Sequence, residues 1–324
     1  MIWKVTVGKG DTSILETEYM TDGDSTERRK SRLMRLATFA AVLTAVLLVG
    51  AKFATWLYTD SVSILSSLVD SLLDTLASLA NLFAVHHALR PADQGHRFGH
   101  GKAEPLAGLA QSAFIVGSSI FLLFEVGSHF FNPRPIEHGM IGIGMMVFSI
   151  IATSILISFQ RYVIRVTGSV AISADRLHYT GDILLNASVI LAILLSMNLG
   201  WNYADPIVGG AIALYILYSA LRIGRRALHI LMDHELPDED RVRIAEIALA
   251  HPQVRDMHDL RTRSSGLHSF IQLHLEMDGG ITLHRAHEIA EQVMRDIRAY
   301  FPNAEVLIHE DPEGIEEERA IFGE

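Results

Sequence analysis

The stretch SVSILSSLVDSLLDTLASLANLFAVHHAL, residues 61–89, decides the fold class of this chain. It is long enough and apolar enough to cross a bilayer as a helix. Asp70 and Asp74 nevertheless lie in its middle, four residues apart and therefore on one helix face. A carboxylate at the bilayer centre costs about 2.5–3.5 kcal/mol on insertion scales, so two of them indicate a function.

Other polar side chains follow the same face of this helix, while the remaining faces are mostly Leu, Val, Ala and Ile. One interpretation is a packed polar seam that only holds helices together. The other, which the paired carboxylates favour, is half of a cation site that faces a bundle interior or a water-filled cavity. The stripe consists of Ser63, Ser67, Asp70, Asp74, Ser78 and Asn81.

The composition of the 324-residue chain agrees with a membrane protein, since 49% of its residues are hydrophobic and the mean hydropathy is +0.27. Cysteine is absent from the sequence, so any metal must be held by Asp, Glu, His or backbone oxygen. The formal net charge of −10 argues against a nucleic-acid partner.

Six hydrophobic spans form a predicted transmembrane domain over residues 34–231, and the polar residues 1–33 before it are expected to be a disordered cytoplasmic arm. Lysine and arginine gather in alternate connections, whereas the opposite connections carry only Arg134, so the positive-inside rule places both termini in the cytoplasm. Lys52 in the first span is expected either to snorkel or to face the bundle. The spans are residues 34–58, 62–89, 103–131, 139–166, 170–197 and 204–231.

The fifth span carries a second pair of possible ligands, His178 and Asp182, again four residues apart, and Asp175 and Asn186 extend the same face. Two helices that each offer two ligands at one-turn spacing can surround an ion tetrahedrally. Three carboxylates and one imidazole suit Zn²⁺, with Fe²⁺, Cd²⁺, Mn²⁺ and Co²⁺ as competitors. The intramembrane site predicted from this spacing consists of Asp70, Asp74, His178 and Asp182.

The connection between the second and third spans holds Asp93, His96 and His100 within eight residues. Taken alone, such a cluster is either a solvated loop or a metal site. Beside an intramembrane metal site it is expected to be a second, weaker site or a relay on the cytoplasmic side.

After Met232 the sequence becomes that of a soluble domain, residues 232–316, followed by a tail at 317–324. Helical and alternating patterns occur in the order αββαβ, which predicts a small α+β sandwich resembling a ferredoxin-like metal-binding domain. Its histidines concentrate on the strands and on the second helix, where they form a candidate metal site as a group. These residues are His258, His274, His287 and His309, with Asp311 close after the last.

Several segments together resemble the cation diffusion facilitators, and in particular their bacterial YiiP-type zinc and ferrous-iron efflux transporters. The resemblance runs from about Leu36 to Pro312. The matching segments are SVSILSSLVDSLLDTLASLANL, PADQGHRFGHGKAEPLAGLAQSAF, ADRLHYTGD, HDLRTR, FIQLHLEM and IHEDP.

The resemblance implies a homodimer in the bacterial inner membrane that exchanges cytoplasmic Zn²⁺ for protons by alternating access. It also implies that the three residue groups above are the transport, loop and binuclear cytoplasmic sites, with Asp311 bridging two ions. Lys102 and Asp233 match an inter-subunit charge pair below the membrane. One departure is Glu310, where the family has glutamine, and its added carboxylate is expected to raise cation affinity or alter selectivity at the cytoplasmic site.

Three other functions stay open at this point. A metal-gated channel would need a continuous pore, and four charged ligands at one place oppose fast flow. An intramembrane metalloprotease would need an open coordination position and a general base, and the sequence has no H-E-x-x-H motif. A metal sensor that transports nothing would keep the cytoplasmic histidines but would not need Asp70 and Asp74.

Overall fold

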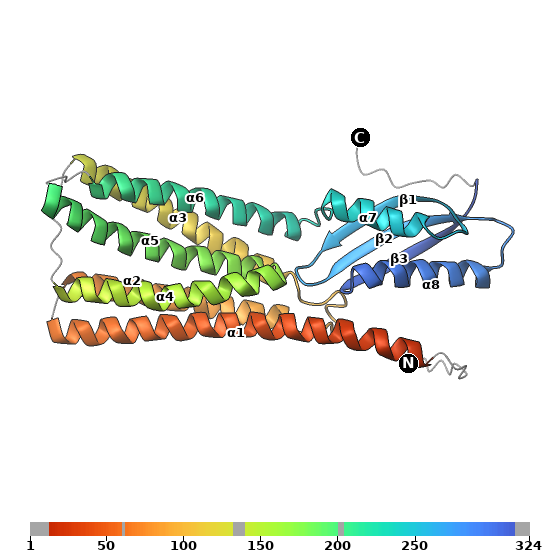
Figure 1. Cartoon of the computed structure of the whole chain (residues 1–324), viewed down its shortest axis with the longest axis horizontal. Coiled ribbons are helices and arrows are strands. Elements are labelled where there is room, and N and C mark those ends of the chain that lie inside the picture. The colour runs from red at the N-terminus through yellow and green to blue at the C-terminus, as the bar shows by residue number, and fades with distance from the viewer. Residues whose placement is uncertain (1–12, 60–61, 132–139, 200–203, 315–324) are drawn as a thin grey trace.

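The computed structural model describes residues 13–59, 62–131, 140–199 and 204–314. A long bundle of helices makes up one part, and a small α+β domain sits at one end of it (Figure 1). The first helix begins at this same end of the bundle. The predicted fold class, an all-α membrane domain joined to a small α+β domain, is confirmed.

All six predicted spans are helices. Among the described residues, five helices are long and apolar enough to cross a membrane. The fifth helix, which carries Asp175, Arg176 and Asp182 in its first half, is not one of those five. The helices are α1 (Ser13–Thr59), α2 (Val62–Ala88), α3 (Ala103–Phe131), α4 (Met140–Thr167), α5 (Val170–Leu199) and α6 (Ala204–Leu231).

The prediction of a disordered arm over residues 1–33 is wrong for residues 13–33, because α1 begins at Ser13. This segment contains no proline and only one glycine, Gly23. Once the apolar part of α1 is helical, each further residue adds one hydrogen bond without a new nucleation cost. Residues 1–12 and the tail at 317–324 lie outside the described residues.

Small side chains let the helices approach closely where they cross. On α1, Ala37, Ala41 and Ala45 follow one another at four-residue spacing, and each is at most 3% exposed. Such small residues on one face are typical of helix contacts in membranes. Helix α2 packs against α1, α3 and α5, which brings the two polar stripes of the sequence together.

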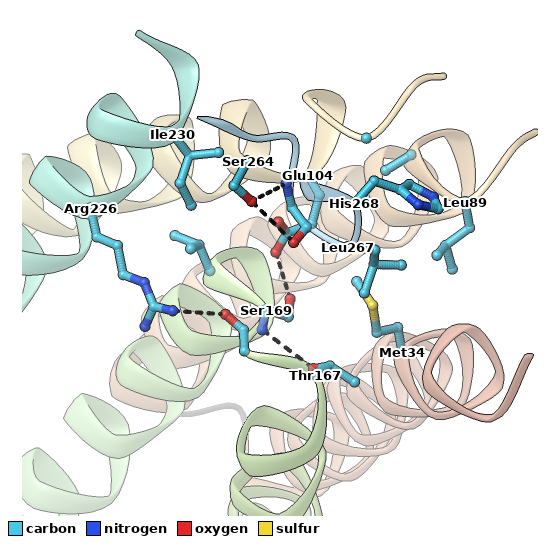
Figure 2. Close-up of a pocket in the computed structure, with 15 residues that line it drawn as sticks. Met34, Leu89, Glu104, Thr167, Ser169, Arg226, Ile230, Ser264, Leu267 and His268 are labelled. Carbon is cyan, nitrogen blue, oxygen red and sulfur yellow. Dashed lines mark hydrogen bonds between the residues drawn. The ribbon is translucent and has the colours of Figure 1, made fainter. Parts of the chain in front are cut away.

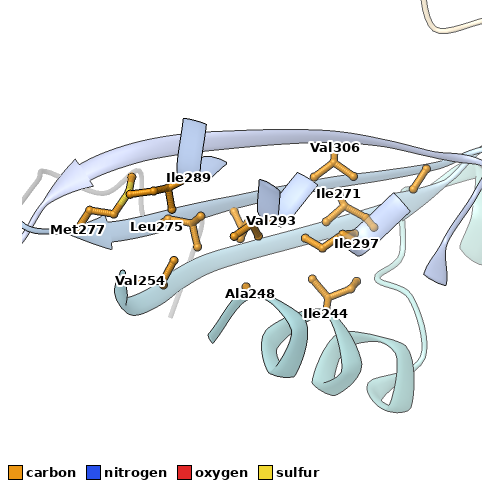
Figure 3. Close-up of a cluster of buried hydrophobic side chains, with 12 residues drawn as sticks. Ile244, Ala248, Val254, Ile271, Leu275, Met277, Ile289, Val293, Ile297 and Val306 are labelled. Atoms are coloured by element: carbon orange, nitrogen blue, oxygen red, sulfur yellow. The ribbon is translucent and has the colours of Figure 1, made fainter. Parts of the chain in front are cut away.

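The small domain has the predicted order αββαβ, in α7 (Asp238–Leu249), β1 (Val254–Ser264), β2 (Ser269–Met277), α8 (Leu283–Tyr300) and β3 (Ala304–Pro312). The sheet order is β1-β2-β3, with β1 antiparallel and β3 parallel to β2. Alternate strand residues pack against the apolar faces of both helices (Figure 3). Because strand side chains alternate between faces, the other face of the sheet is left for the histidines.

The two parts of the molecule meet where the β1–β2 turn reaches the ends of the bundle helices. A cavity of about 150 Å³ lies at this joint, lined by residues of the turn and of several bundle helices (Figure 2). Glu104 of α3 is buried beside it and accepts hydrogen bonds from the Ser169 hydroxyl at 2.6 Å and the Ala171 N–H at 2.8 Å. The start of α3 is thereby tied to the start of α5.

Candidate metal centres

Asp74 of α2 and the pair His178 and Asp182 of α5 come together inside the helix bundle. Each offers a ligand atom, and the three atoms lie within 4.8 Å of one another. His178 Nε2 lies 2.9 Å from Asp74 Oδ1 and 3.9 Å from Asp182 Oδ2. All three side chains are half-buried, and two carboxylates and an imidazole at this separation can close around one divalent transition-metal ion.

Asp70, the fourth residue of the predicted site, lies outside this group of three. Its side chain is exposed on α2, and it interacts with Asp74 only through charge. Two further residues of the stripe face inward, since Ser78 and Asn81 are 1% and 4% exposed. The Ser78 hydroxyl lies 2.9 Å from the buried Tyr179 hydroxyl of α5, which fixes the α2–α5 contact beside the cluster.

The loop between α2 and α3 gathers Asp93, His96 and His100 into a second group, again within 4.8 Å. Asp93 Oδ1 accepts the backbone N–H of His96 at 2.7 Å and that of Gly95 at 2.8 Å. These N–H donors, with that of His96 first, hold the pKa of the Asp93 carboxyl below its ordinary value. The loop therefore presents an ionised carboxylate next to two imidazoles.

His87 is a neighbour of the loop group that the sequence reasoning missed. Its ring lies 4.8 Å from the ring of His100 in an edge-to-face arrangement. The adjacent histidines His86 and His87 in the last turn of α2 were the available signal, because that turn leads directly into the loop.

The third group lies on the open face of the small domain's sheet. The strand register pairs His258 with His274, and His274 with His309, so the three histidines form one row across β1, β2 and β3. Their neighbouring rings are 5.1 and 4.6 Å apart. Asp311, only 4% exposed, lies beneath the row.

Asp311 is in reach of every histidine of the row. Its carboxylate oxygens lie 3.4 Å from His258 Nε2, 2.8 Å from His274 Nδ1 and 3.0 Å from His309 Nε2. A carboxylate with two oxygens among three imidazoles can bind one metal ion or bridge two.

His287 does not join this row within one chain. It belongs to α8, which packs on the opposite face of the sheet, and its side chain is 64% exposed. Its Nδ1 atom lies 3.9 Å from a carboxylate oxygen of Glu310. Glu310 thus stands beside His287 and faces away from the histidine row, since side chains alternate along β3.

Lys102 and Asp233 meet within one chain. Lys102 Nζ lies 2.8 Å from Asp233 Oδ1, and Arg263 lies 3.6 Å from the same oxygen. Asp233 follows α6 with a positive φ of 56°, so a tight turn directs its carboxylate toward the α3 end. The pair connects the bundle to the small domain inside one subunit.

Comparison with known proteins agrees with this division into two parts. The cation efflux transmembrane domain matches residues 38–232, and the cation efflux protein cytoplasmic domain matches residues 236–313. The chain belongs to the cation efflux family.

Curated relatives cover nearly the whole of this cation efflux protein. The cation-efflux pump FieF of Cronobacter sakazakii is 49% identical over 281 residues, which is 87% of this chain and 93% of that protein. FieF of Escherichia coli strain K12 is 48% identical over the same lengths. The solved Zn form of CzrB is 31% identical and covers 26% of this chain and 99% of that chain, with a TM-score of 0.25.

These relatives are pumps, and the chain is therefore a membrane transporter that exports metal cations, rather than an enzyme. Its several apolar helices make it a multi-pass membrane protein.

Proposed function

We propose that this cation efflux protein exports Zn²⁺ from the cytoplasm in exchange for protons, by alternating access to one site inside the bundle. The observation that carries the proposal is the meeting of Asp74, His178 and Asp182 between α2 and α5. A carboxylate–imidazole site favours Zn²⁺, while Fe²⁺, Cd²⁺, Mn²⁺ and Co²⁺ are alternative cargo for the same site.

Asp70 is proposed as the fourth ligand. It lies one turn from Asp74 on α2, so a small rotation of that helix would bring its carboxylate toward the other three ligands. Such a rotation is the kind of movement that opens a site first to one side of the membrane and then to the other.

Proton coupling is proposed from the chemistry of the same ligands. A metal ion can bind the His178 ring only through a nitrogen that carries no proton, so metal and proton compete for one atom. Neighbouring carboxylates also repel one another and attract a proton when the metal has left. After the metal has been released, the site is therefore expected to carry protons back toward the cytoplasm.

The loop group and the histidine row are proposed to bind the same metals on the cytoplasmic side, where the loop collects ions and the row stabilises a homodimer. Metal binding to one conformation shifts the population toward it by mass action. We place the protein in the bacterial inner membrane with both termini in the cytoplasm, on the charge pattern of the connections.

The test is metal flux into proteoliposomes that contain the purified protein and a pH-sensitive dye. Wild-type protein is expected to move Zn²⁺, and Asp182→Ala is expected to abolish that flux while the protein stays folded. Asp238→Ala is the control, because Asp238 is an exposed residue at the start of α7, which belongs to the small domain and not to the bundle. Near-normal Zn²⁺ flux by Asp182→Ala would exclude this site as the transport site.

A further inference from the structure

A lysine lies inside the helix bundle next to the intramembrane cluster. Lys52 of α1 is half-buried, and its ammonium donates hydrogen bonds to the Ser71 hydroxyl at 2.6 Å and to the Ser67 carbonyl oxygen at 3.2 Å. Both acceptors belong to α2. From the sequence, Lys52 was expected either to snorkel to the interface or to face the bundle, and in the structure it faces the bundle.

The two oxygens that hold Lys52 are neutral, so they orient the ammonium without cancelling its charge. An ammonium inside a membrane protein is costly unless opposite charge stands near it. That opposite charge comes from the metal-site carboxylates, since Lys52 interacts electrostatically with Asp182, Asp74 and Asp70.

The position of Lys52 makes this interaction a fixed feature of the site. Ser71 precedes Asp74 by three residues on α2, so both lie on the same side of that helix about one turn apart. Ser71 is only 4% exposed, and its hydroxyl holds the ammonium at the end of the cluster nearer the start of α2.

The charges indicate what the lysine does. With Asp70 as the proposed fourth ligand, the site holds three ionised carboxylates, and these with the Lys52 ammonium have a net charge that a single divalent ion neutralises. Without the lysine, the same three carboxylates would leave the bound ion in a site of excess negative charge. Excess negative charge tightens binding but opposes release, and a transporter has to release its ion in every cycle.

We propose that Lys52 is a tethered counter-charge that weakens divalent-ion binding at the Asp74–His178–Asp182 cluster enough to permit release. The inference rests on the proposed function, since it assigns Lys52 to the same transport site. Lys52 is a positioning residue in this role: it acts on the ion through the carboxylates and does not bind it.

Three substitutions separate charge from packing. Lys52→Met removes both the charge and the hydrogen bonds, Lys52→Gln removes the charge but keeps a donor for Ser71, and Lys52→Arg keeps the charge. Thr44→Val is the control, because Thr44 lies two turns away on α1 and its hydroxyl donates only within that helix, to Ala40 O at 2.9 Å. Each is made in full-length protein that also carries His96→Ala and His274→Ala, so that Zn²⁺ binding at the other two groups is weakened.

The first measurement is Zn²⁺ affinity by titration calorimetry in nanodiscs, and the second is the KM and maximal rate of Zn²⁺ flux in proteoliposomes. Lys52→Met and Lys52→Gln are expected to tighten Zn²⁺ binding by about tenfold, which corresponds to about 1.4 kcal/mol. They are also expected to lower KM and maximal flux together, since the ion leaves more slowly. Lys52→Arg and Thr44→Val are expected to match the parent protein.

Unchanged or weaker Zn²⁺ affinity in the neutral variants would overturn the proposal, whatever happens to flux. If Lys52→Met fails to fold, Lys52→Gln decides on the same criterion. A lower maximal rate at unchanged KM would show that Lys52 has only a structural role, and this result would also overturn the proposal. A parent protein that binds Zn²⁺ in a Lys52-dependent way but moves none would instead refute the transport function alone.

Discussion

At the scale of single residues, His178 is the one nitrogen ligand in the group with Asp74 and Asp182. We predict that His178→Asp lowers the flux of Zn²⁺ relative to Cd²⁺ and Mn²⁺ by about tenfold, because imidazole suits Zn²⁺ and a site of oxygen ligands alone loses that preference over larger cations. The measurement is flux in proteoliposomes for each metal. His284→Asp, at an exposed position on α8, is the control, and an unchanged ratio would show that His178 does not set the preference.

Asp93 supports a second prediction at this scale, which concerns pH. Its pKa is depressed because the backbone N–H groups of His96 and Gly95 donate to the carboxylate. A depressed carboxyl pKa contributes stability that is full above its unfolded value, about 3.9, and is lost as the pH falls through the lower folded value. Lowering the pH from 7 to 5 should therefore leave the loop's backbone hydrogen bonds intact.

Hydrogen exchange of the loop amides tests the pH prediction. Protection at Gly95 and His96 should persist at pH 5 and be lost in Asp93→Ala at any pH. Asp93→Asn keeps an oxygen acceptor and should retain part of the protection. Loss of protection in the wild-type loop between pH 7 and 5 would contradict the role of the Asp93 carboxylate.

At the scale of elements, the joint between the bundle and the small domain depends on a close backbone approach at Gly101. A Cβ atom added there would clash with the Ser265 carbonyl oxygen, so the β1–β2 turn would have to move. We predict that Gly101→Ala destabilises the folded protein by about 1–3 kcal/mol. Thermal unfolding measures this change, and Gly50→Ala is the matched control because its Cβ would meet nothing within 4 Å. Equal unfolding temperatures for the two variants would show that the close approach is not needed for stability.

The same element-scale argument applies to the sheet, whose register aligns the histidine row. The domain over residues 236–313 has its own apolar core, so we expect it to fold alone and to bind Zn²⁺. His274→Ala or Asp311→Ala should weaken this binding by at least about tenfold, since the first removes an imidazole ligand and the second a carboxylate ligand. Calorimetry measures the Zn²⁺ affinity, with His284→Ala as the control. If the wild-type domain bound no Zn²⁺, the histidine row would be a surface feature only.

At the scale of the whole molecule, the proposed exchange predicts that proton movement accompanies metal movement. Each Zn²⁺ that leaves the cytoplasmic side should bring at least one proton the other way, and an imposed pH gradient should speed or slow Zn²⁺ flux according to its direction. The pH dye in the flux assay measures this. Zn²⁺ flux that ignores the gradient, with no proton counter-movement, would favour uniport.

The architecture of the whole molecule was predictable from its sequence because it depends on local properties. The length of an apolar run decides whether a helix can span a bilayer, and alternation decides which strand residues reach a core. Four-residue spacing is likewise sufficient to predict that His178 and Asp182 share one face of α5. The continuation of α1 to Ser13 was not predicted, because the polar composition of this segment does not favour a helix by itself. A polar segment joined to a stable helix can nevertheless become helical without a nucleation step of its own.

What only the tertiary structure decided is how each helix is rotated and which faces of the sheet are covered. Four residues along a helix differ by about 40° in direction, so the packing of α2 admits Asp74 to the cluster and leaves Asp70 at its edge. The placement of α8 on one face separates His287 from the histidine row. Lys52 reaches Ser71 of α2 for the same reason: its direction depends on how α1 packs against α2, which no spacing within either segment determines.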